Sequence, residues 1–146
     1  MRSVIVGVLV GGVVCLTSML LLGAVHRYVY GPALAEFGDP AFFTDMSTWG
    51  IVALIAVRVF SAWLGSSVAV RLSNEPHATW TGPVVVMIGA LTTLILMGLA
   101  QPIWSLLLSA LVVFGMALAV GRSHVGLPVI PGLGELKALV ARTPET

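Results

Sequence analysis

Arg58 is the residue whose type and position most clearly raise a question of chemistry, because it lies near the middle of an otherwise uncharged apolar stretch, residues 49–70. A guanidinium at that depth costs at least ~2.5–3.5 kcal/mol to insert into a bilayer, and charges inside spans mark functional sites by default. On the same helical face, Ser61, Gly65 and Ala69 form a ladder of small residues that lets another helix approach closely. The charge is therefore expected to point toward protein.

Hydroxyl side chains are spaced so that they can surround this guanidinium. At ~1.5 Å of rise per residue, Arg58 lies roughly 13 Å along its helix from Trp49. Five hydroxyl residues of the other apolar stretches lie at similar or slightly smaller depths: Thr17, Ser18, Thr92, Thr93 and Ser109. We therefore predict one intramembrane polar site centred on Arg58. Hydroxyl oxygens accept hydrogen bonds from a guanidinium, but they do not neutralise its charge.

The counter-charge for Arg58 must come from elsewhere, because none of the apolar stretches contains Asp or Glu. Three sources remain open: a carboxylate from the connection before the second stretch (Glu36, Asp39 or Asp45), a carboxylate of a partner subunit, or a lipid phosphate or transported anion. A fourth alternative is that the long side chain extends to the lipid headgroups. A carboxylate partner would make Arg58 part of a packed structural pair, whereas a transported anion would make it part of a substrate site.

The remaining residues with catalytic or metal-binding chemistry do not form a recognisable set. Cys15 is the single cysteine, so it can form no intramolecular disulfide and is expected to be a buried thiol. His26 is far along the chain from His77 and His124, which provide only two metal ligands even if they meet. The sequence has no paired intramembrane carboxylates and no phosphate-binding Gly-Lys loop. We predict no catalytic, cofactor-binding or metal residues, no cofactor, and a protein that is not an enzyme.

The composition indicates which elements must position these residues. Of 146 residues, 58% are hydrophobic and 9% are charged, whereas a soluble domain has charge on about a quarter of its residues. Four apolar stretches are each near the ~20 residues that cross a bilayer as a helix: 3–24, 49–70, 83–100 and 103–120. The prediction is an all-α fold, a four-transmembrane-helix bundle within residues 1–122.

Charge in the connections sets the expected orientation and partners. A cytoplasmic N-terminus leaves only Arg27 outside and places five basic residues inside: Arg2, Arg71, Arg122, Lys137 and Arg142. Both termini are therefore expected in the cytoplasm.

The first span is expected to be retained, because 3–24 is longer than a normal signal core; a cleaved secretion signal is the alternative. The net charge of +1 argues against nucleic acid, and the expected partners are membrane lipid, a membrane-protein partner or a second copy.

The connections between the predicted spans are expected to have different structures. Within residues 25–48, Asp39 followed by Pro40 is typical of a helix N-terminus, so a short interfacial helix is expected there, and Ser47 or Thr48 can cap the second span. Residues 71–82 are expected to be a turn region.

Residues at the two ends of the chain add two further predictions. Gly7 and Gly11 form a second close-approach surface, on the first span. Residues 123–146 form a Gly/Pro-rich cytoplasmic tail, which either contains a short amphipathic helix near its end or is frayed.

Three short motifs carry a family resemblance over residues 49–122. They are Leu64-Gly-Ser-Ser-Val-Ala-Val-Arg-Leu72, then His77, then Gln101-Pro-Ile-Trp104 between two apolar runs. In these the chain resembles a broad group of small uncharacterised prokaryotic four-helix integral membrane proteins. It departs from the group in having Ser66 where a second glycine is usual, and in a nearly neutral inner loop. The resemblance implies a four-helix topology and the bacterial inner membrane.

Two functional hypotheses follow from these residues. The first is a non-enzymatic accessory, scaffold or assembly component that contacts its partner through Arg58 and the ladder of Ser61, Gly65 and Ala69. The alternative is a small oligomeric transporter or channel for an anion or amphipathic solute, in which Arg58 attracts negative charge. Four short helices enclose little volume, so a pore would require two or more copies.

Overall fold

The computed structural model describes residues 2–30, 46–97 and 102–125, and every regular element in these ranges is a helix. The helices are α1 (Arg2–Tyr30), α3 (Thr48–Ser73), the short 3₁₀ helix η1 (Pro76–Trp80), α4 (Thr81–Met97) and α5 (Ile103–His124). Four segments are long and apolar enough to span a membrane. The predictions of an all-helical protein and of four segments long and apolar enough to span a membrane are confirmed.

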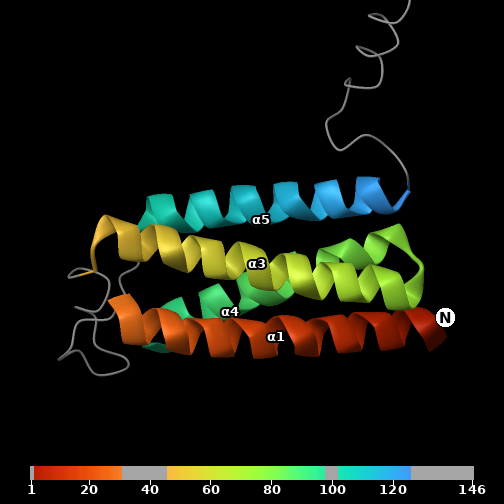
Figure 1. Ribbon diagram of the computed structural model, residues 1–146, viewed down its shortest axis with the longest axis horizontal. Coiled ribbons are helices and arrows are strands. Elements are labelled where there is room, and N and C mark those ends of the chain that lie inside the picture. Colours follow the sequence, from red (N-terminus) through yellow and green to blue (C-terminus); the bar gives the residue numbers. More distant parts are fainter. Residues whose placement is uncertain (1, 31–45, 98–101, 126–146) are drawn as a thin grey trace, which may run out of the picture.

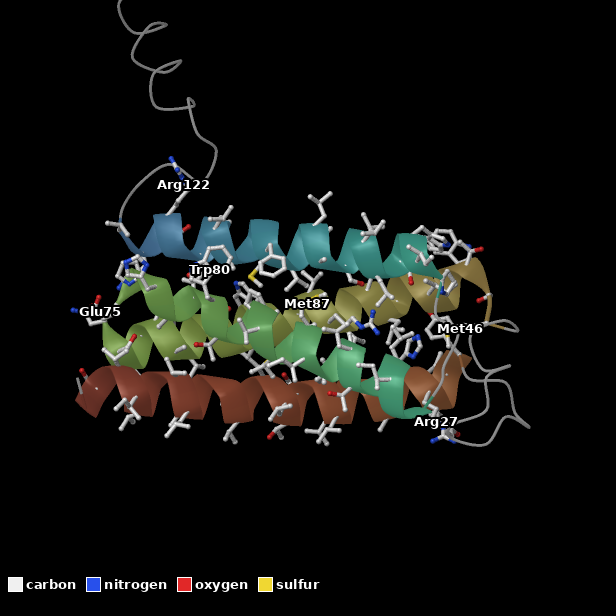
Figure 2. The ribbon with its side chains drawn as sticks, turned by 180° about the vertical axis from the view of Figure 1, so that it is seen from behind. Arg27, Met46, Glu75, Trp80, Met87 and Arg122 are labelled. Carbon is white, nitrogen blue, oxygen red and sulfur yellow. The ribbon has the colours of Figure 1, made fainter. Side chains whose placement is uncertain are left out.

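The long helices run side by side, and α3 contacts α1, α4 and α5 (Figure 1). The beginning of α1 and the ends of α3 and α5 lie at one end of the bundle, which we call the proximal end; the opposite end is the distal end. Figure 2 shows Glu75 and Arg122 at the proximal end and Arg27 at the distal end. Helix α3 is thus the central element, and it carries Arg58.

Three of the helices continue past the C-terminal ends of the predicted spans. Helix α1 continues to Tyr30, α3 to Ser73 and α5 to His124. The charge-free stretches underestimate these helices because a basic residue is favourable in the last turn, where it faces the negative end of the helix dipole. Arg27, Arg71 and Arg122 occupy those last turns. The last three residues of the predicted third span, 98–100, lie outside the described residues.

Helix α3 has a defined cap at each end. Ser47 is the N-cap, and its hydroxyl accepts a hydrogen bond from the Gly50 N–H at 3.2 Å, which confirms one of the two predicted caps. At the other end Asn74 has a φ of 57°, a left-handed conformation that asparagine tolerates, and its N–H donates to the Val70 carbonyl. Pro76 then starts η1, so the expected turn region at 71–82 is mostly helical.

The interior contains mainly small side chains, with Met46, Ile51 and Ile55 as larger buried ones, whereas most large aliphatic side chains lie on the outside. Cys15, Ala62, Val86 and Val113 form a cluster at the centre that has no exposed surface. Exposed side chains on the outer faces of α1 and α5 include Leu9, Leu20, Leu107 and Leu111. This distribution is expected when the surrounding medium is apolar, because small residues then allow close helix packing without any loss from exposing Leu. The fold is that of a multi-pass helical membrane protein.

The predicted tail was residues 123–146, but Ser123 and His124 belong to α5. The rest of that tail from residue 126, the expected interfacial helix and the carboxylates Glu36, Asp39 and Asp45 lie outside the described residues.

Candidate functional site

Arg58 is enclosed by protein. Its side chain is 7% exposed, and its Nη1 donates a hydrogen bond of 3.4 Å to Ser109 Oγ on α5. Ser109 is itself buried. The bond links two helices across 51 positions of the chain, and this placement does not favour the alternative in which Arg58 extends to the lipid headgroups. Arg58 therefore acts as a polar contact between α3 and α5.

The other hydroxyls predicted for this site have different surroundings. Thr17 on α1 and Thr92 on α4 are exposed on the outer surface of the bundle. Ser18 donates to the Cys15 carbonyl at 2.9 Å, and Thr93 donates to the Gly89 carbonyl at 2.8 Å, so each hydroxyl proton is used within its own helix. Five hydroxyl residues were predicted to lie near Arg58. In the described part of the chain, Ser109 is the one among them that forms a hydrogen bond with Arg58. Depth along a helix does not determine which side of that helix a residue occupies.

The small-residue ladder of α3 packs against α1 of the same chain. A Cβ atom built on Gly65 would lie 2.5 Å from the Cys15 Cβ and 2.8 Å from the Gly11 carbonyl oxygen. A Cβ on Gly11 would lie 2.7 Å from the Cβ of Ala69. The ladder residue Ser61 is completely buried. In this structure the face carrying the ladder is therefore not exposed to a partner protein.

Gly7 extends this contact toward the proximal end. A Cβ atom built on Gly7 would lie 2.7 Å from the Ala69 carbonyl oxygen and 2.8 Å from the Ser73 Cβ. Such distances leave no room for a side chain, so Gly7, Gly11 and Gly65 together allow the backbones of α1 and α3 to approach closely.

A second inter-helix hydrogen bond, at the distal end, was not anticipated from the sequence. His26 is 5% exposed, and its Nε2 lies 2.7 Å from the Gly50 carbonyl oxygen near the start of α3. A carbonyl can only accept, so this nitrogen carries the proton. The ring also stacks on Tyr30, with centroids 5.4 Å apart. The predicted first span ended at Ala24 and left His26 in a loop, which hid its position on α1.

We expect His26→Phe to lower the free energy of unfolding by about 0.5–1.5 kcal/mol, because it removes this hydrogen bond while keeping an aromatic ring beside Tyr30. His77→Phe is the control, since His77 is exposed. Denaturant titration of the two purified variants in detergent measures the difference. Equal effects would show that the bond to Gly50 contributes nothing.

The proximal half of α3 is joined to η1 and α4 by contacts that the expected turn region did not predict. The buried Ser66 hydroxyl donates to the Thr79 carbonyl at 2.6 Å. A Cβ atom built on Gly82 would overlap the Ala62 carbonyl oxygen and lie 2.5 Å from Ser66 Oγ, so glycine is required for α4 to start against α3. Ser61 Oγ, by contrast, has no hydrogen-bond partner among the described residues.

Cys15 lies at the junction of α1, α3 and α4. It has no exposed surface, and its Sγ is 3.8 Å from the Gly82 carbonyl oxygen. A buried thiol in apolar surroundings reacts slowly, because the thiolate is the reactive form.

A water-soluble maleimide should therefore leave Cys15 unmodified in the folded protein and add once after unfolding in SDS. Ser123→Cys is the control, because position 123 is exposed at the proximal end. It should take up one label when folded and two when unfolded, as counted by intact-mass measurement. Rapid labelling of the folded wild-type chain would contradict the buried position of Cys15.

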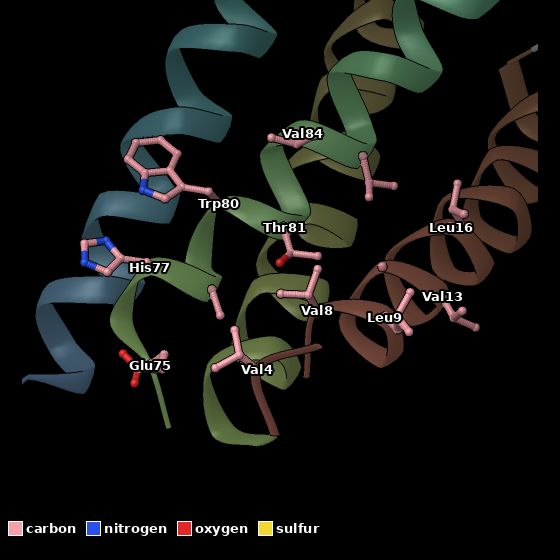
Figure 3. Close-up of a pocket in the computed structure, with 13 residues that line it drawn as sticks. Val4, Val8, Leu9, Val13, Leu16, Glu75, His77, Trp80, Thr81 and Val84 are labelled. Atoms are coloured by element: carbon pink, nitrogen blue, oxygen red, sulfur yellow. The ribbon is translucent and has the colours of Figure 1, made fainter. Parts of the chain in front are cut away.

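His77 and His124 line different cavities in the described part of the bundle. A groove of about 700 Å³ between α1, η1 and α4 is lined mainly by aliphatic side chains, with His77 and Glu75 near its end (Figure 3). A cavity of about 410 Å³ between α3 and α5 is lined by His124, Arg71 and serines as well as by apolar residues. Within the described ranges, no group of three or more His, Cys, Asp or Glu side chains could hold a metal ion.

The four spanning segments and the enclosed Arg58 define the class of this molecule, a multi-pass helical membrane protein with a buried cation between two helices. No protein-family model, curated protein or solved structure matches the chain.

Proposed function

We propose that the chain is a non-enzymatic accessory, scaffold or assembly component of a bacterial inner membrane, with both termini in the cytoplasm. The observation that carries this proposal is the hydrogen bond between Arg58 and Ser109, since it uses the intramembrane cation to join two helices of the chain itself. The close packing of α1 on α3 supports the same role, because a rigid bundle can present a constant outer surface to another membrane protein.

The proposed partner contact is on the outside of the bundle. Thr17 and Thr92 are exposed although they lie well inside their helices. Polar side chains at such depths serve as contacts between transmembrane helices, where a double-mutant cycle attributes about 0.6 kcal/mol to an average hydrogen bond. These two exposed positions replace the face of Ser61, Gly65 and Ala69 as the candidate partner contacts.

The cytoplasmic position proposed for the proximal end is supported by charge. Arg71 lies in the last turn of α3, which ends at this end of the bundle. Figure 2 shows Arg122 at the same end and Arg27 at the distal end. Basic residues flanking spans are retained on the cytoplasmic side.

The alternative, an oligomeric transporter or channel for an anion or amphipathic solute, has weaker support. Arg58 lines neither of the two cavities described above. Neither of these two cavities therefore leads a solute to Arg58.

Purification in mild detergent after crosslinking in the native membrane tests the proposal. We expect one membrane protein to co-purify in fixed stoichiometry, and the reverse capture with that protein to recover this chain. The double variant Thr17→Val and Thr92→Val should reduce recovery several-fold, whereas the control Thr93→Val should not, because that hydroxyl bonds its own helix. A monomer without a partner, or anion flux in liposomes that Arg58→Gln abolishes, would overturn the proposal.

A further inference from the structure

The cavity between α3 and α5 differs from the larger groove in both its position and its chemistry. It lies toward the proximal ends of the two helices, where Arg71 and His124 contribute cationic or hydrogen-bond-donating groups to its lining. Among the described residues that line the groove, the charged side chain is Glu75, which would repel an anion. Of these two cavities, the one between α3 and α5 therefore suits a negatively charged group.

The polar and apolar residues that line this cavity lie at different depths along the helices. On α3 the cavity is bounded by Trp63, Ser67 and Arg71, which are spaced one turn apart along one face. At ~1.5 Å per residue, Arg71 lies roughly 33 Å from Trp49, about the thickness of the hydrocarbon layer, whereas Trp63 lies roughly 12 Å deeper than Arg71. The polar end of the cavity thus falls at headgroup level and the aromatic end at acyl-chain level.

Helix α5 repeats this order. His124 and Ser123 line the cavity at the proximal end, and Met116 lines it about two turns deeper. The Ser123 hydroxyl donates to its own helix, at the Ala119 carbonyl, so the donors available to a ligand are Arg71, His124 and Ser67. Two facing helices therefore form a slot that is polar at one end and apolar at the other.

We propose that this slot binds one anionic phospholipid, with its phosphate beside Arg71 and His124 and an acyl chain extending toward Trp63 and Met116. A volume of about 410 Å³ holds a headgroup and the first part of a chain, while the rest of the lipid stays in the bilayer. Basic pockets between transmembrane helices are suited to anionic headgroups. The site is independent of any protein partner.

Binding to the full-length protein in detergent, measured with phosphatidylglycerol against phosphatidylcholine, tests this inference. We expect native mass spectrometry to retain one phosphatidylglycerol per chain, and this lipid to raise the thermal midpoint more than phosphatidylcholine does. Arg71→Gln should weaken phosphatidylglycerol binding about fivefold. Arg27→Gln, which makes the same change in charge at the distal end, should leave binding unchanged.

Two further measurements distinguish a bound lipid from a bound phosphate ion. Inorganic phosphate at millimolar concentration should neither stabilise the protein nor displace the lipid, because it has no chain for the apolar end of the slot. Trp63→Ala should weaken phosphatidylglycerol binding even though the charge is unchanged. Equal binding of both lipids, equal loss in Arg71→Gln and Arg27→Gln, or stabilisation by phosphate alone would overturn the proposal.

Discussion

Gly65→Ala lowers the thermal stability of the protein in detergent, whereas Gly115→Ala raises it slightly or leaves it unchanged. The added methyl group at position 65 meets the Cys15 Cβ at 2.5 Å and the Gly11 carbonyl oxygen at 2.8 Å, and neither atom can move without shifting a helix. Overpacking of this kind costs about 1–3 kcal/mol. At position 115 nothing lies within 4 Å, so the change only removes the helix penalty of glycine, which is about 1 kcal/mol.

Unfolding followed by circular dichroism in one detergent measures both variants. Gly11→Ala should behave as Gly65→Ala does, because its Cβ would lie 2.6 Å from the Gly65 carbonyl oxygen. Gly23→Ala on the same helix is the matched control, since nothing lies within 4 Å of that position. Similar shifts for Gly11→Ala and Gly23→Ala would mean that α1 and α3 do not approach as closely as described.

A double-mutant cycle identifies the contact itself. Cys15→Gly removes the Cβ atom that the new methyl group of Gly65→Ala would meet, so the double variant should be more stable than the sum of the two single changes predicts. Residues in direct contact typically show coupling of about 0.5–3 kcal/mol. Additive effects would place Cys15 and Gly65 apart.

The helices were predictable from the sequence, but their rotation was not. In a soluble bundle, an apolar stripe shows which face is buried. In a membrane both faces are apolar, so the sequence of α5 does not distinguish the buried Val113 from the exposed Val112. For the same reason, depth along the helix could not show that Thr17 and Thr92 lie on the outside while Ser109 faces Arg58.

The sequence showed which small residues allow close helix packing, but it did not show which helices they bring together. Gly7 and Gly11 on one helix and Gly65 and Ala69 on another are both patterns for close approach, and nothing in one chain says that they match each other. The structure pairs them within the bundle. His26 was missed for a different reason, because the helix continues beyond the last apolar residue of its span.

Arg58→Ala is expected to have the largest effect of any single substitution on α3. Truncation leaves a cavity in the bundle and removes a donor from Ser109, and large-to-small changes at buried sites cost about 2–5 kcal/mol. Arg58→Met keeps most of the volume and should cost less. Arg71→Ala is the control on the same helix, because exposed substitutions usually change stability by less than about 0.5 kcal/mol.

The Arg58 variants also separate the two functional hypotheses. If Arg58 joins α3 to α5, then Ser109→Ala should cost about 1 kcal/mol in the wild-type background and less in the Arg58→Met background, since the bond is already absent there. A cation that acts on a solute would give the opposite pattern: Arg58→Met would remain stable with no coupling to Ser109, yet it would lose anion flux in liposomes. The stability cycle and the flux assay, made on the same purified variants, therefore decide whether the intramembrane charge holds the bundle together or serves transport.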